Sequence, residues 1–508
     1  MNELLTSAQM RAIEAAAIQG GTVTGQELME RAGAGVVAAI DREFPDFAQG
    51  GPRVVVLCGP GNNGGDGFVI ARLLQGRGWQ VGVRLYGDAD RLPPDAGANF
   101  RRWTALGDVA PLAQDDLPPC DLIVDALFGT GLARPLIPPR DPLAGLQPRP
   151  RVVAVDIPSG ICADSGRVLE GGVYIPADLT VTFHRLKLGH VLDAGGLACG
   201  KVLVCDIGLG DNPAQGEAAR EVAVAPKILR KGGREMANKF SFGHLLVLGG
   251  SAGQGGAARL AARGALRIGA GLVTIGCPPA ALAENAARLD AIMLRPVPDS
   301  AALSSMLQDP RITALCLGPA LSLGLRERDM VATALAARRA TVLDADALTL
   351  IGQDDALFAA LHDRCVLTPH GGEFARLFPD IAERLAAGAT AGPAFSKLDA
   401  ARDAAARAGC TILFKGADTV IAAPHGPVLV NAAVRERAAP WLATAGAGDV
   451  LAGFIAGLLA RGMDAQTAAA TGAWLHVEAA RRFGPGLIAE DLPETLPAVL
   501  CDLLAQNT

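Results

Sequence analysis

Three polar, glycine-flanked motifs in the first third of the chain carry side chains that can do chemistry. They read Gly59-Pro-Gly-Asn-Asn-Gly-Gly-Asp-Gly67, Asp125-Ala-Leu-Phe-Gly-Thr-Gly-Leu132 and Asp156-Ile-Pro-Ser-Gly160. Each follows an apolar run of strand length, so in a parallel sheet all three meet at the carboxyl edge, where α/β folds bind ligands. Amide, hydroxyl and carboxylate oxygens suit an alkali or alkaline-earth ion. The motifs therefore predict one oxygen-rich site.

The first motif also has the glycine spacing of a dinucleotide-binding loop, through Gly59, Gly61 and Gly64. Asp66 argues against that function, because a carboxylate is unfavourable where a pyrophosphate would rest on helix amides. Asp88 lies at about the distance expected for a ribose contact. The alternative is a tight polar turn without a ligand.

A second candidate site lies near the end of the chain, in Ala443-Thr-Ala-Gly-Ala-Gly-Asp-Val-Leu-Ala-Gly453. Small residues before a helix allow backbone amides to surround negative charge that develops on a phosphoryl group. Asp449, expected in the first helical turn, can deprotonate a hydroxyl bound there. The alternative is that Asp449 only complements the helix dipole.

Two other strand ends add polar side chains to this half. Lys415, in Leu413-Phe-Lys-Gly-Ala-Asp-Thr419, is a rare lysine in an arginine-rich chain, although it can also be a structural residue with a buried stem. Thr368-Pro-His-Gly-Gly-Glu373 places His370 and Glu373 after another strand. A lone histidine is more often structural than a ligand, but this one lies in a Pro/Gly turn.

The elements that must position these residues alternate between strands and helices. Helices are expected after Ser7, after the Thr24-x-x-Glu27 capping box and over Phe68–Gly76. The strands expected in the first half are Arg53–Cys58, Gln80–Tyr86, Leu122–Val124 and Val152–Val155. Those expected in the second half are His244–Leu248, Leu272–Ile275, Ala314–Leu317, Thr341–Leu343, Val366–Leu367, Thr411–Phe414 and Val428–Val430. This alternation predicts an α/β fold with mostly parallel sheets.

Two tandem domains fit the length of 508 residues. We expect one over residues 1–215 and the other over 225–508, joined by the turn-rich stretch Gly208–Ala225. Half of the residues are hydrophobic and the net charge is −6, which argues against disorder and against nucleic-acid binding. Ten scattered cysteines, no signal-peptide pattern and an apolar run, Val450–Ala460, too short to span a bilayer predict a soluble cytoplasmic protein that binds no membrane.

The first half resembles the NAD(P)H-hydrate epimerases over about residues 1–211, through its three glycine-flanked motifs. The resemblance implies a Rossmann-like doubly wound sheet, a potassium ion held by Asn63, Asp125 and Ser159, and Asp156 as the catalytic acid/base. It also implies that the hydrate is bound by Asn62, Asn63, Gly64, Gly65, Asp66, Gly129, Thr130, Gly131, Leu132, Ala133, Arg134, Pro135 and Asp156.

The second half resembles the ADP/ATP-dependent NAD(P)H-hydrate dehydratases, which have a ribokinase-like fold. The resemblance rests on Asn238-Lys-Phe-Ser-Phe-Gly-His244, Gly249-Gly-Ser251, Gly255-Gly-Ala257, Gly269-Ala-Gly-Leu-Val273 and Leu317-Gly-Pro319. It implies that the hydrate contacts Ala257, Gly318, His370 and the catalytic Asp449, and that the nucleotide contacts Lys415, Gly416, Ala417, Asp418, Thr419 and Gly448. The family usually has Pro where this chain has Gly371 and Ser where it has Ala447; activity is expected to be retained because the backbone amides remain.

Together the resemblances imply a repair enzyme for NADHX and NADPHX, the hydrated forms of the reduced cofactors. Its epimerase half interconverts the R and S hydrates, and its dehydratase half returns the S form to NADH or NADPH at the expense of ADP or ATP with Mg²⁺, ADP being preferred. We also expect a homo-oligomer. The alternatives are a vitamin or sugar kinase of the ribokinase-like fold fused to a nucleotide-binding module, or a silent regulatory module fused to an enzyme.

Overall fold

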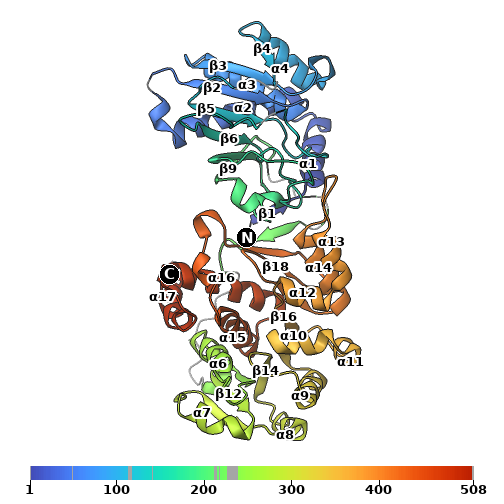
Figure 1. Cartoon of the computed structure of the whole chain (residues 1–508), viewed down its shortest axis with the longest axis vertical. Coiled ribbons are helices and arrows are strands. Elements are labelled where there is room, and N and C mark those ends of the chain that lie inside the picture. The colour runs from blue at the N-terminus through green and yellow to red at the C-terminus, as the bar shows by residue number, and fades with distance from the viewer. Residues whose placement is uncertain are drawn as a thin grey trace. The chain divides into compact units, whose positions relative to one another are not determined.

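The computed structural model describes residues 2–48, 50–112, 117–139, 141–210, 214, 216, 218–225, 231 and 238–505. They form two compact units, one of Asn2–Ala219 with Ala387–Lys397, the other of Arg220–Ala386 and Leu398–Thr508. Both consist of helices and mostly parallel strands, so the predicted α/β class is confirmed (Figure 1). Within the predicted connection Gly208–Ala225, residues 211–213, 215 and 217 lie outside the described residues.

The first unit contains a parallel sheet with both faces buried. Alternate residues of strand β2 (Arg53–Cys58) belong to two apolar clusters, Val54 and Val56 to one, Val55 and Leu57 to the other, as in a doubly wound sheet. The strands lie in the order β4 (Val109–Pro111), β3 (Gln80–Leu85), β2 (Arg53–Cys58), β5 (Leu122–Ala126), β6 (Arg151–Val155), β7 (Leu179–Phe183) and β9 (Lys201–Cys205). Strands β1 (Asn2–Leu5) and β8 (Leu186–Lys187) pair with each other in parallel. The sequence analysis did not predict β1, β4, β7, β8 or β9.

The first two helices of this unit begin at side-chain caps, one of which was predicted from the sequence. The Thr24–Glu27 capping box is present, whereas the first helix is capped by Thr6, whose hydroxyl accepts from the Gln9 amide, and not by Ser7. The helices are α1 (Ser7–Gln19), α2 (Gly25–Glu43), α3 (Asn62–Gln75), α4 (Pro94–Thr104) and α5 (Gly195–Ala198), with 3₁₀ turns η1 (Pro45–Ala48), η2 (Ala89–Arg91) and η3 (Leu188–His190).

Helix α3 begins six residues before the predicted start at Phe68, so the prediction that the glycine-rich motif is a turn was wrong. Its glycines serve close packing. A Cβ at Gly64 would lie 2.0 Å from the Gly59 carbonyl oxygen, and a Cβ at Gly65 would lie 2.5 Å from the Met29 sulfur. Tertiary packing therefore overrides the low helix propensity of glycine here.

The segment Ala387–Lys397 packs within the first unit, which the sequence analysis did not anticipate. The Arg167 guanidinium donates to the carbonyls of Ala387 (2.6 Å) and Phe395 (3.2 Å), and the Gly392 amide donates to the Ala133 carbonyl (3.2 Å). Ala394 belongs to a small apolar cluster with Leu132, Cys162 and Leu169. The first unit therefore includes residues far apart in the sequence.

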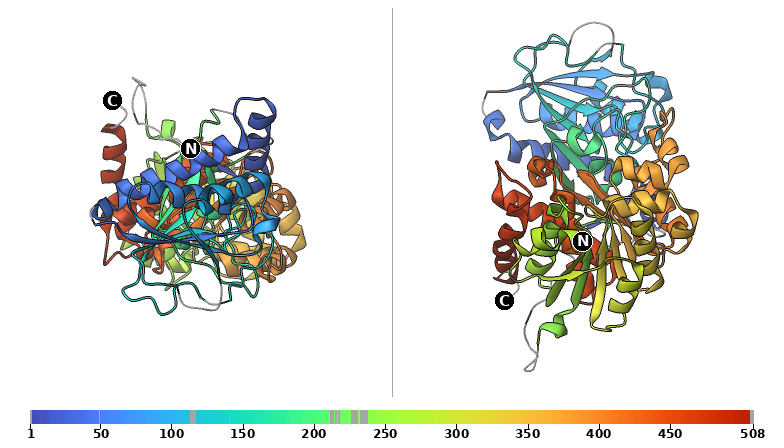
Figure 2. Two further views of the ribbon diagram at one scale, coloured as in Figure 1. Left: turned by 90° about the horizontal axis from the view of Figure 1, so that it is seen from above. Right: turned by 60° about the horizontal axis from the view of Figure 1, so that its bottom comes forward.

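The second unit contains a ten-stranded sheet that is parallel from β13 to β17. The order is β13 (Met293–Pro296), β12 (Leu272–Cys277), β11 (His244–Leu248), β14 (Ile312–Leu317), β15 (Ala340–Leu343), β16 (Cys365–Leu367), β17 (Thr411–Phe414), β18 (Asp418–Ala422), β19 (Leu429–Ala432) and β10 (Ala219–Glu221). Strand β18 is antiparallel to both of its neighbours, β17 and β19, and β10 pairs with β19 in parallel. Strands β10, β13 and β18 were not predicted. Figure 2 (right) shows these strands between the red helices and the yellow-to-orange helices.

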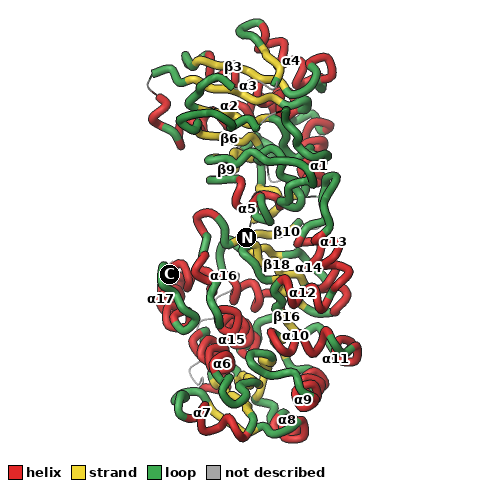
Figure 3. The backbone as a smooth tube through the Cα atoms, viewed as in Figure 1, coloured by secondary structure: helices red, strands yellow, loops and turns green. Residues whose placement is uncertain are grey.

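An almost entirely buried helix, α15, packs against α6 and α16 in this unit (Figure 3). Gly453 and Gly457 permit the close approach, since Cβ atoms there would lie 2.1 Å from the Ala261 and 2.8 Å from the Ala265 carbonyl oxygens of α6. The helices are α6 (Gly256–Arg267), α7 (Leu282–Ala286), α8 (Ser300–Met306), α9 (Leu325–Ala336), α10 (Ala345–Gly352), α11 (Asp355–Ala359), α12 (Gly371–Leu377), α13 (Pro379–Ala386), α14 (Lys397–Ala408), α15 (Ala447–Ala460), α16 (Ala465–Phe483) and α17 (Asp491–Ala505). The 3₁₀ turns are η4 (Lys239–Phe242), η5 (Pro279–Ala281), η6 (Arg435–Arg437) and η7 (Pro440–Leu442). Among the described residues, no helix combines the length and hydropathy needed to cross a membrane.

Candidate active sites of the two units

Asp125 and Ser159, two of the expected potassium ligands, form a buried pair in the first unit. Asp125 is the fourth residue of β5, and Ser159 lies in the loop after β6; both side chains are buried. The Ser159 hydroxyl donates to Asp125 Oδ1 (2.6 Å), and the Ser159 amide donates to Oδ2 (2.8 Å). Burial raises the pKa of Asp125 to about 6, although these hydrogen bonds oppose the shift.

Asn63, the third expected ligand, has a buried side-chain nitrogen without a hydrogen-bond partner among the described residues. Its oxygen lies near Gly129: a Cβ on that glycine would be 2.8 Å from Asn63 Oδ1 and 2.9 Å from Asp156 Oδ2. The described residues contain no cluster of three or more His, Cys, Asp or Glu side chains arranged for a metal. The amide, hydroxyl and carboxylate oxygens of Asn63, Ser159 and Asp125 instead fit a hard cation such as potassium.

Asp156, the expected acid/base, follows β6 directly and has a left-handed backbone with φ of 68°. Its Oδ1 accepts from Lys187 Nζ (2.8 Å) and from the Thr182 hydroxyl (2.9 Å). Its Oδ2 accepts from the backbone amide of Thr130 (3.1 Å). Burial works to raise the pKa of Asp156, but the charge and hydrogen bond of Lys187 outweigh burial and lower it. Asp156 is therefore held as a carboxylate.

Two other carboxyl groups interact electrostatically with this carboxylate. Burial, followed by the charge of Asp156, raises the pKa of Glu14, and the same two causes raise the pKa of Asp66 well above its ordinary value. Environments that push the pKa values of neighbouring carboxyl groups in opposite directions favour a base beside an acid. Glu14 was not predicted as a site residue, because one glutamate in an amphipathic helix carries no sequence signal.

The expected hydrate-binding residues fall into two groups. Asn63, Asp66, Gly129, Thr130 and Asp156 come together around the carboxylate. Gly64 and Gly65 are buried in the packing of α3, while Asn62, Gly131, Ala133 and Arg134 are exposed, Pro135 is half-buried and Leu132 is buried. Thr130 to Ala133 also line a small cavity of about 90 Å³ with Arg11, Cys162 and Pro393.

In the second unit, Asp449 lies in the first turn of α15, as predicted. Its helix starts at Gly446, which has a φ of 87° and serves as the N-cap. Burial raises the pKa of Asp449 to about 7; the charge of Asp344 adds to the shift, and that of Lys415 opposes it. A carboxyl group with this pKa can gain and lose a proton near neutral pH.

Lys415, expected to contact the nucleotide, is held by two carboxylates. Its Nζ lies 2.9 Å from Asp344 Oδ1 and 3.5 Å from Glu373 Oε2. Burial disfavours the charged form, but these two carboxylates outweigh it and raise the pKa of Lys415. Asp344 also accepts from the Thr368 hydroxyl (2.8 Å).

The remaining expected residues lie at neighbouring strand ends. Gly318, after β14, has a φ of 126°, and a Cβ there would be 1.7 Å from the Asp344 carbonyl oxygen, so only glycine fits. His370 caps α12 through its ring nitrogen, and its amide donates to Glu373 (2.8 Å). A Cβ at Gly448 would lie 3.7 Å from Lys415 Nζ. Gly416 and Thr419 hydrogen-bond each other in the β17–β18 turn that holds Ala417, and Asp418 begins β18. Ala257 is the second residue of α6.

At Gly371, where the family usually has Pro, a Cβ would meet nothing within 4 Å, so no steric contact requires glycine there.

Asp344 was not predicted, although it follows an apolar strand just as Asp125 and Asp156 do. The sequence signal was therefore available. Lys187 likewise shares the property that singled out Lys415, being one of seven lysines among 46 basic residues and lying between two leucines.

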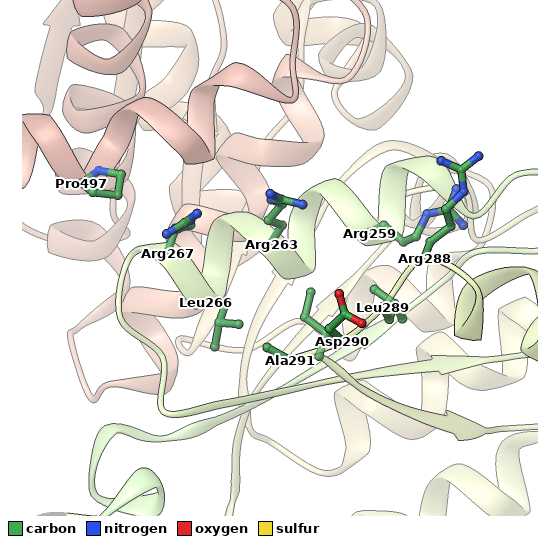
Figure 4. A pocket seen from close by; sticks show the side chains of 10 residues that line it. Arg259, Arg263, Leu266, Arg267, Arg288, Leu289, Asp290, Ala291 and Pro497 are labelled. Atoms are coloured by element: carbon green, nitrogen blue, oxygen red, sulfur yellow. The ribbon is translucent and has the colours of Figure 1, made fainter.

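A larger hollow of about 510 Å³ also lies in the second unit, beside α6 (Figure 4). Its lining includes Arg259, Arg263 and Arg267, which α6 presents on one face. Arg263 and Arg267 both pair with Glu494, and Arg259 pairs with Glu284 at 3.3 Å. The described lining residues include none of the predicted site residues, so this hollow is not the predicted dehydratase site.

Both halves of the chain match known proteins. The family model described as NAD(P)H-hydrate dehydratase matches residues 245–497, and the one described as YjeF-related protein N-terminus matches residues 25–189. A bifunctional NAD(P)H-hydrate repair enzyme from Moorella thermoacetica is 36% identical over 98% of this chain and 97% of its own length. An NAD(P)H-hydrate epimerase from Rhodobacter capsulatus is 52% identical over 41% of this chain and 100% of its own length. A solved structure of an ADP/ATP-dependent NAD(P)H-hydrate dehydratase from Bacillus subtilis shares 26% identity and a TM-score of 0.42, covering 54% of this chain and 93% of that chain.

Proposed function

This chain belongs to the family of bifunctional NAD(P)H-hydrate repair enzymes, and from that membership we propose how its two sites divide the reaction. The protein is an enzyme with an epimerase half and a dehydratase half. The first unit interconverts the R and S hydrates of NADH and NADPH. The second unit then removes the C6 hydroxyl of the S hydrate with the help of ADP or ATP.

In the first unit, Asp156 is the proposed proton acceptor. Interconverting the two epimers at C6 requires a base that takes the hydroxyl proton and an acid that returns one. The surroundings lower the pKa of Asp156, whereas burial and the charge of Asp156 raise the pKa values of Glu14 and Asp66. The single observation that supports this assignment is the Oδ2 atom of Asp156, which points to the Thr130 amide beside Gly129.

Potassium fits the neighbouring oxygen set, and we propose that Asn63, Asp125 and Ser159 hold it. When bound, the ion would supply positive charge that favours an ionised Asp125 and orders the loop after β5. The oxygen donors support this proposal: Asp125 and Ser159 are buried in contact with each other, and oxygen ligands are those that hard cations prefer.

In the second unit, Asp449 is the proposed base. The C6 hydroxyl loses its proton to Asp449 as its oxygen forms a bond to the terminal phosphorus of the nucleotide, whose bridging P–O bond breaks. The phosphate then leaves C6 while C5 releases a proton, which yields the dihydronicotinamide, inorganic phosphate and AMP or ADP. The amides at the start of α15 suit the phosphoryl charge, and Mg²⁺ on the nucleotide would neutralise part of it.

The alternative of a vitamin or sugar kinase is not favoured, because NAD(P)H-hydrate relatives match both halves of the chain. The nucleotide is proposed to contact Lys415 to Thr419 and Gly448, with Ala257, Gly318 and His370 on the hydrate side. The approach of Gly448 to Lys415 supports this grouping.

A direct test is to incubate the protein with mixed NADHX epimers and ADP, or ATP, while following the absorbance of reduced nicotinamide. Complete recovery from both epimers is expected, faster than spontaneous epimerisation permits. Omitting the nucleotide should leave the total hydrate constant but equilibrate R and S, as separated by chromatography. If no NADH is recovered, the dehydratase assignment is refuted. If part of the R hydrate remains and decays only slowly, the epimerase assignment is refuted.

A further inference from the structure

Lys187 is a buried charged residue whose contacts all serve Asp156 or its neighbours. We propose that Lys187 is the positioning residue of the epimerase site, fixing Asp156 so that Oδ2 alone is the oxygen offered to the hydrate. The proposal deepens the function proposed above and rests on it. Nothing in the sequence motifs assigns a role to this lysine.

The ammonium group of Lys187 has a hydrogen-bond acceptor for each of its N–H donors. It contacts Asp156 Oδ1 (2.8 Å), Thr182 Oγ1 (2.8 Å) and the Phe183 carbonyl oxygen (3.0 Å). An ammonium group has three N–H donors, so these acceptors use all of them. Because only 1% of the side chain is exposed, Lys187 acts on the substrate through Asp156 and not by contact.

Oδ1 of Asp156 is correspondingly fixed from two sides. The Thr182 hydroxyl donates to Oδ1 (2.9 Å) while accepting from Lys187, so the three groups form a closed triangle. Hydrogen bonds that involve charged groups are shorter and stronger than neutral ones. Rotation of the carboxylate would break two of them together.

The backbone of Asp156 is held by the same short stretch of chain. Its amide donates to the Val181 carbonyl (2.8 Å), and its carbonyl accepts from His190 Nε2 (2.7 Å). The Lys187 amide donates to His190 Nδ1 (2.8 Å), which fixes the histidine tautomer with its proton on Nε2. These contacts keep Asp156 in a left-handed conformation that a non-glycine residue rarely adopts.

Oδ2 differs from Oδ1 in its surroundings. Within the described part of the chain it accepts one hydrogen bond, from the Thr130 amide, and it faces the space where Gly129 has no side chain. Asn63 Oδ1 faces the same space. The geometry therefore leaves Oδ2 as the oxygen that can receive the C6 hydroxyl proton.

The charges around the carboxylate agree with this role. Glu14 and Asp66 are the carboxyl groups that interact with Asp156, Lys187 is its cation, and His190 contacts its backbone. Without Lys187, Asp156 would be a buried carboxylate among acids, which strongly favours the protonated and inactive form.

The test uses the full chain, purified S hydrate and no nucleotide, so that only the appearance of the R hydrate is measured. Lys187→Met should lower the kcat of epimerisation about 10²- to 10⁴-fold, the usual contribution of a general base. The KM should stay within about twofold, because no Lys187 donor reaches the hydrate. Thr182→Val keeps the ammonium but removes one hydrogen bond to Oδ1, and should lower kcat about three- to tenfold.

Lys201→Met is the matched control, since Lys201 is also paired with a carboxylate, Glu43 at 2.6 Å, but is half exposed. It should leave both constants unchanged. A folded Lys187→Met variant with normal kcat, or with only KM altered, would overturn the proposal. If that variant fails to fold, Thr182→Val decides, and a normal kcat there overturns it. A wild-type chain that does not epimerise would refute the proposed function instead.

Discussion

Replacing Asp449 by asparagine should inactivate the dehydratase while stabilising the second unit at neutral and higher pH. Asparagine keeps the size of the side chain but cannot accept the hydroxyl proton, so turnover should fall about 10²- to 10⁴-fold. Stability should change in the opposite direction, because wild-type Asp449 must ionise in a partly buried place beside Asp344. A residue kept for catalysis at a cost in stability shows both effects together.

The size of the stability effect follows from the pKa of Asp449. A pKa of about 7 in the folded chain, against 3.8 ordinarily, corresponds to about 4 kcal/mol between the two protonation states. Partial exposure reduces this, and the lost charge at the helix N-terminus costs about 0.3–1 kcal/mol in the variant. A net gain of about 1–2 kcal/mol remains, or about 2–6 °C in the Tm of a unit of this size.

The pH dependence distinguishes this cause from others. Since the folded pKa is raised, the wild type is relatively most stable below about pH 4 and loses stability as pH rises towards 7. Asparagine does not titrate, so the Tm advantage of Asp449→Asn should be absent near pH 4 and complete above pH 7. The assays are calorimetry across this range and NADH recovery from S hydrate with saturating nucleotide. Asp491→Asn, in the first turn of α17, is the control. A variant with near-normal turnover, or a Tm difference independent of pH, would refute the reasoning.

Three further perturbations follow from the two sites. Asp125→Ala should impair epimerisation and abolish its dependence on potassium, while dehydration of S hydrate persists. Both activities are measured across a potassium titration, and an epimerase activity that depends on potassium as in the wild type would contradict the prediction. Gly129→Ala should reduce epimerisation at least tenfold, because the new Cβ would meet two oxygens at 2.8 and 2.9 Å. The control is Gly82→Ala in β3, which should be neutral because a Cβ there would meet only the Val54 carbonyl oxygen, at 3.9 Å. The rate of dehydration should rise with pH through about 7 as Asp449 ionises. The rate of epimerisation should persist to lower pH, because the pKa of Asp156 is lowered. Coincident pH profiles of the two activities would contradict both assignments.

Elements and strand-end residues could be predicted where the signal is local. Apolar runs predict the strands that carry Asp125, Asp156 and Lys415, and glycine-flanked motifs mark the loops after them. The start of α3 could not be predicted, because the glycines of its first turns are required by backbone and side chains from other elements. Propensity alone treats such glycines as a turn.

The contacts that set the charge of each site were beyond local reasoning for a different reason. Lys187 lies 31 positions from Asp156, and Asp344 lies 71 positions from Lys415, so only the fold reveals either pair. Burial of a lysine also depends on packing, which one sequence does not display. The sequence therefore predicted which residues carry chemistry better than it predicted what sets their protonation.

The two units use a buried lysine at a strand end with opposite consequences for the proposed base. In the first unit, Lys187 contacts the base itself, so Asp156 is stabilised as a carboxylate despite its burial. In the second unit, Lys415 forms ion pairs with Asp344 and Glu373 and not with the proposed base. Burial, followed by the charge of Asp344, raises the pKa of Asp449 to about 7, although the charge of Lys415 opposes the shift. The same pair of residue types thus gives a base with a lowered pKa in one site and a base that titrates near neutrality in the other, and the difference lies in which carboxylate the lysine touches.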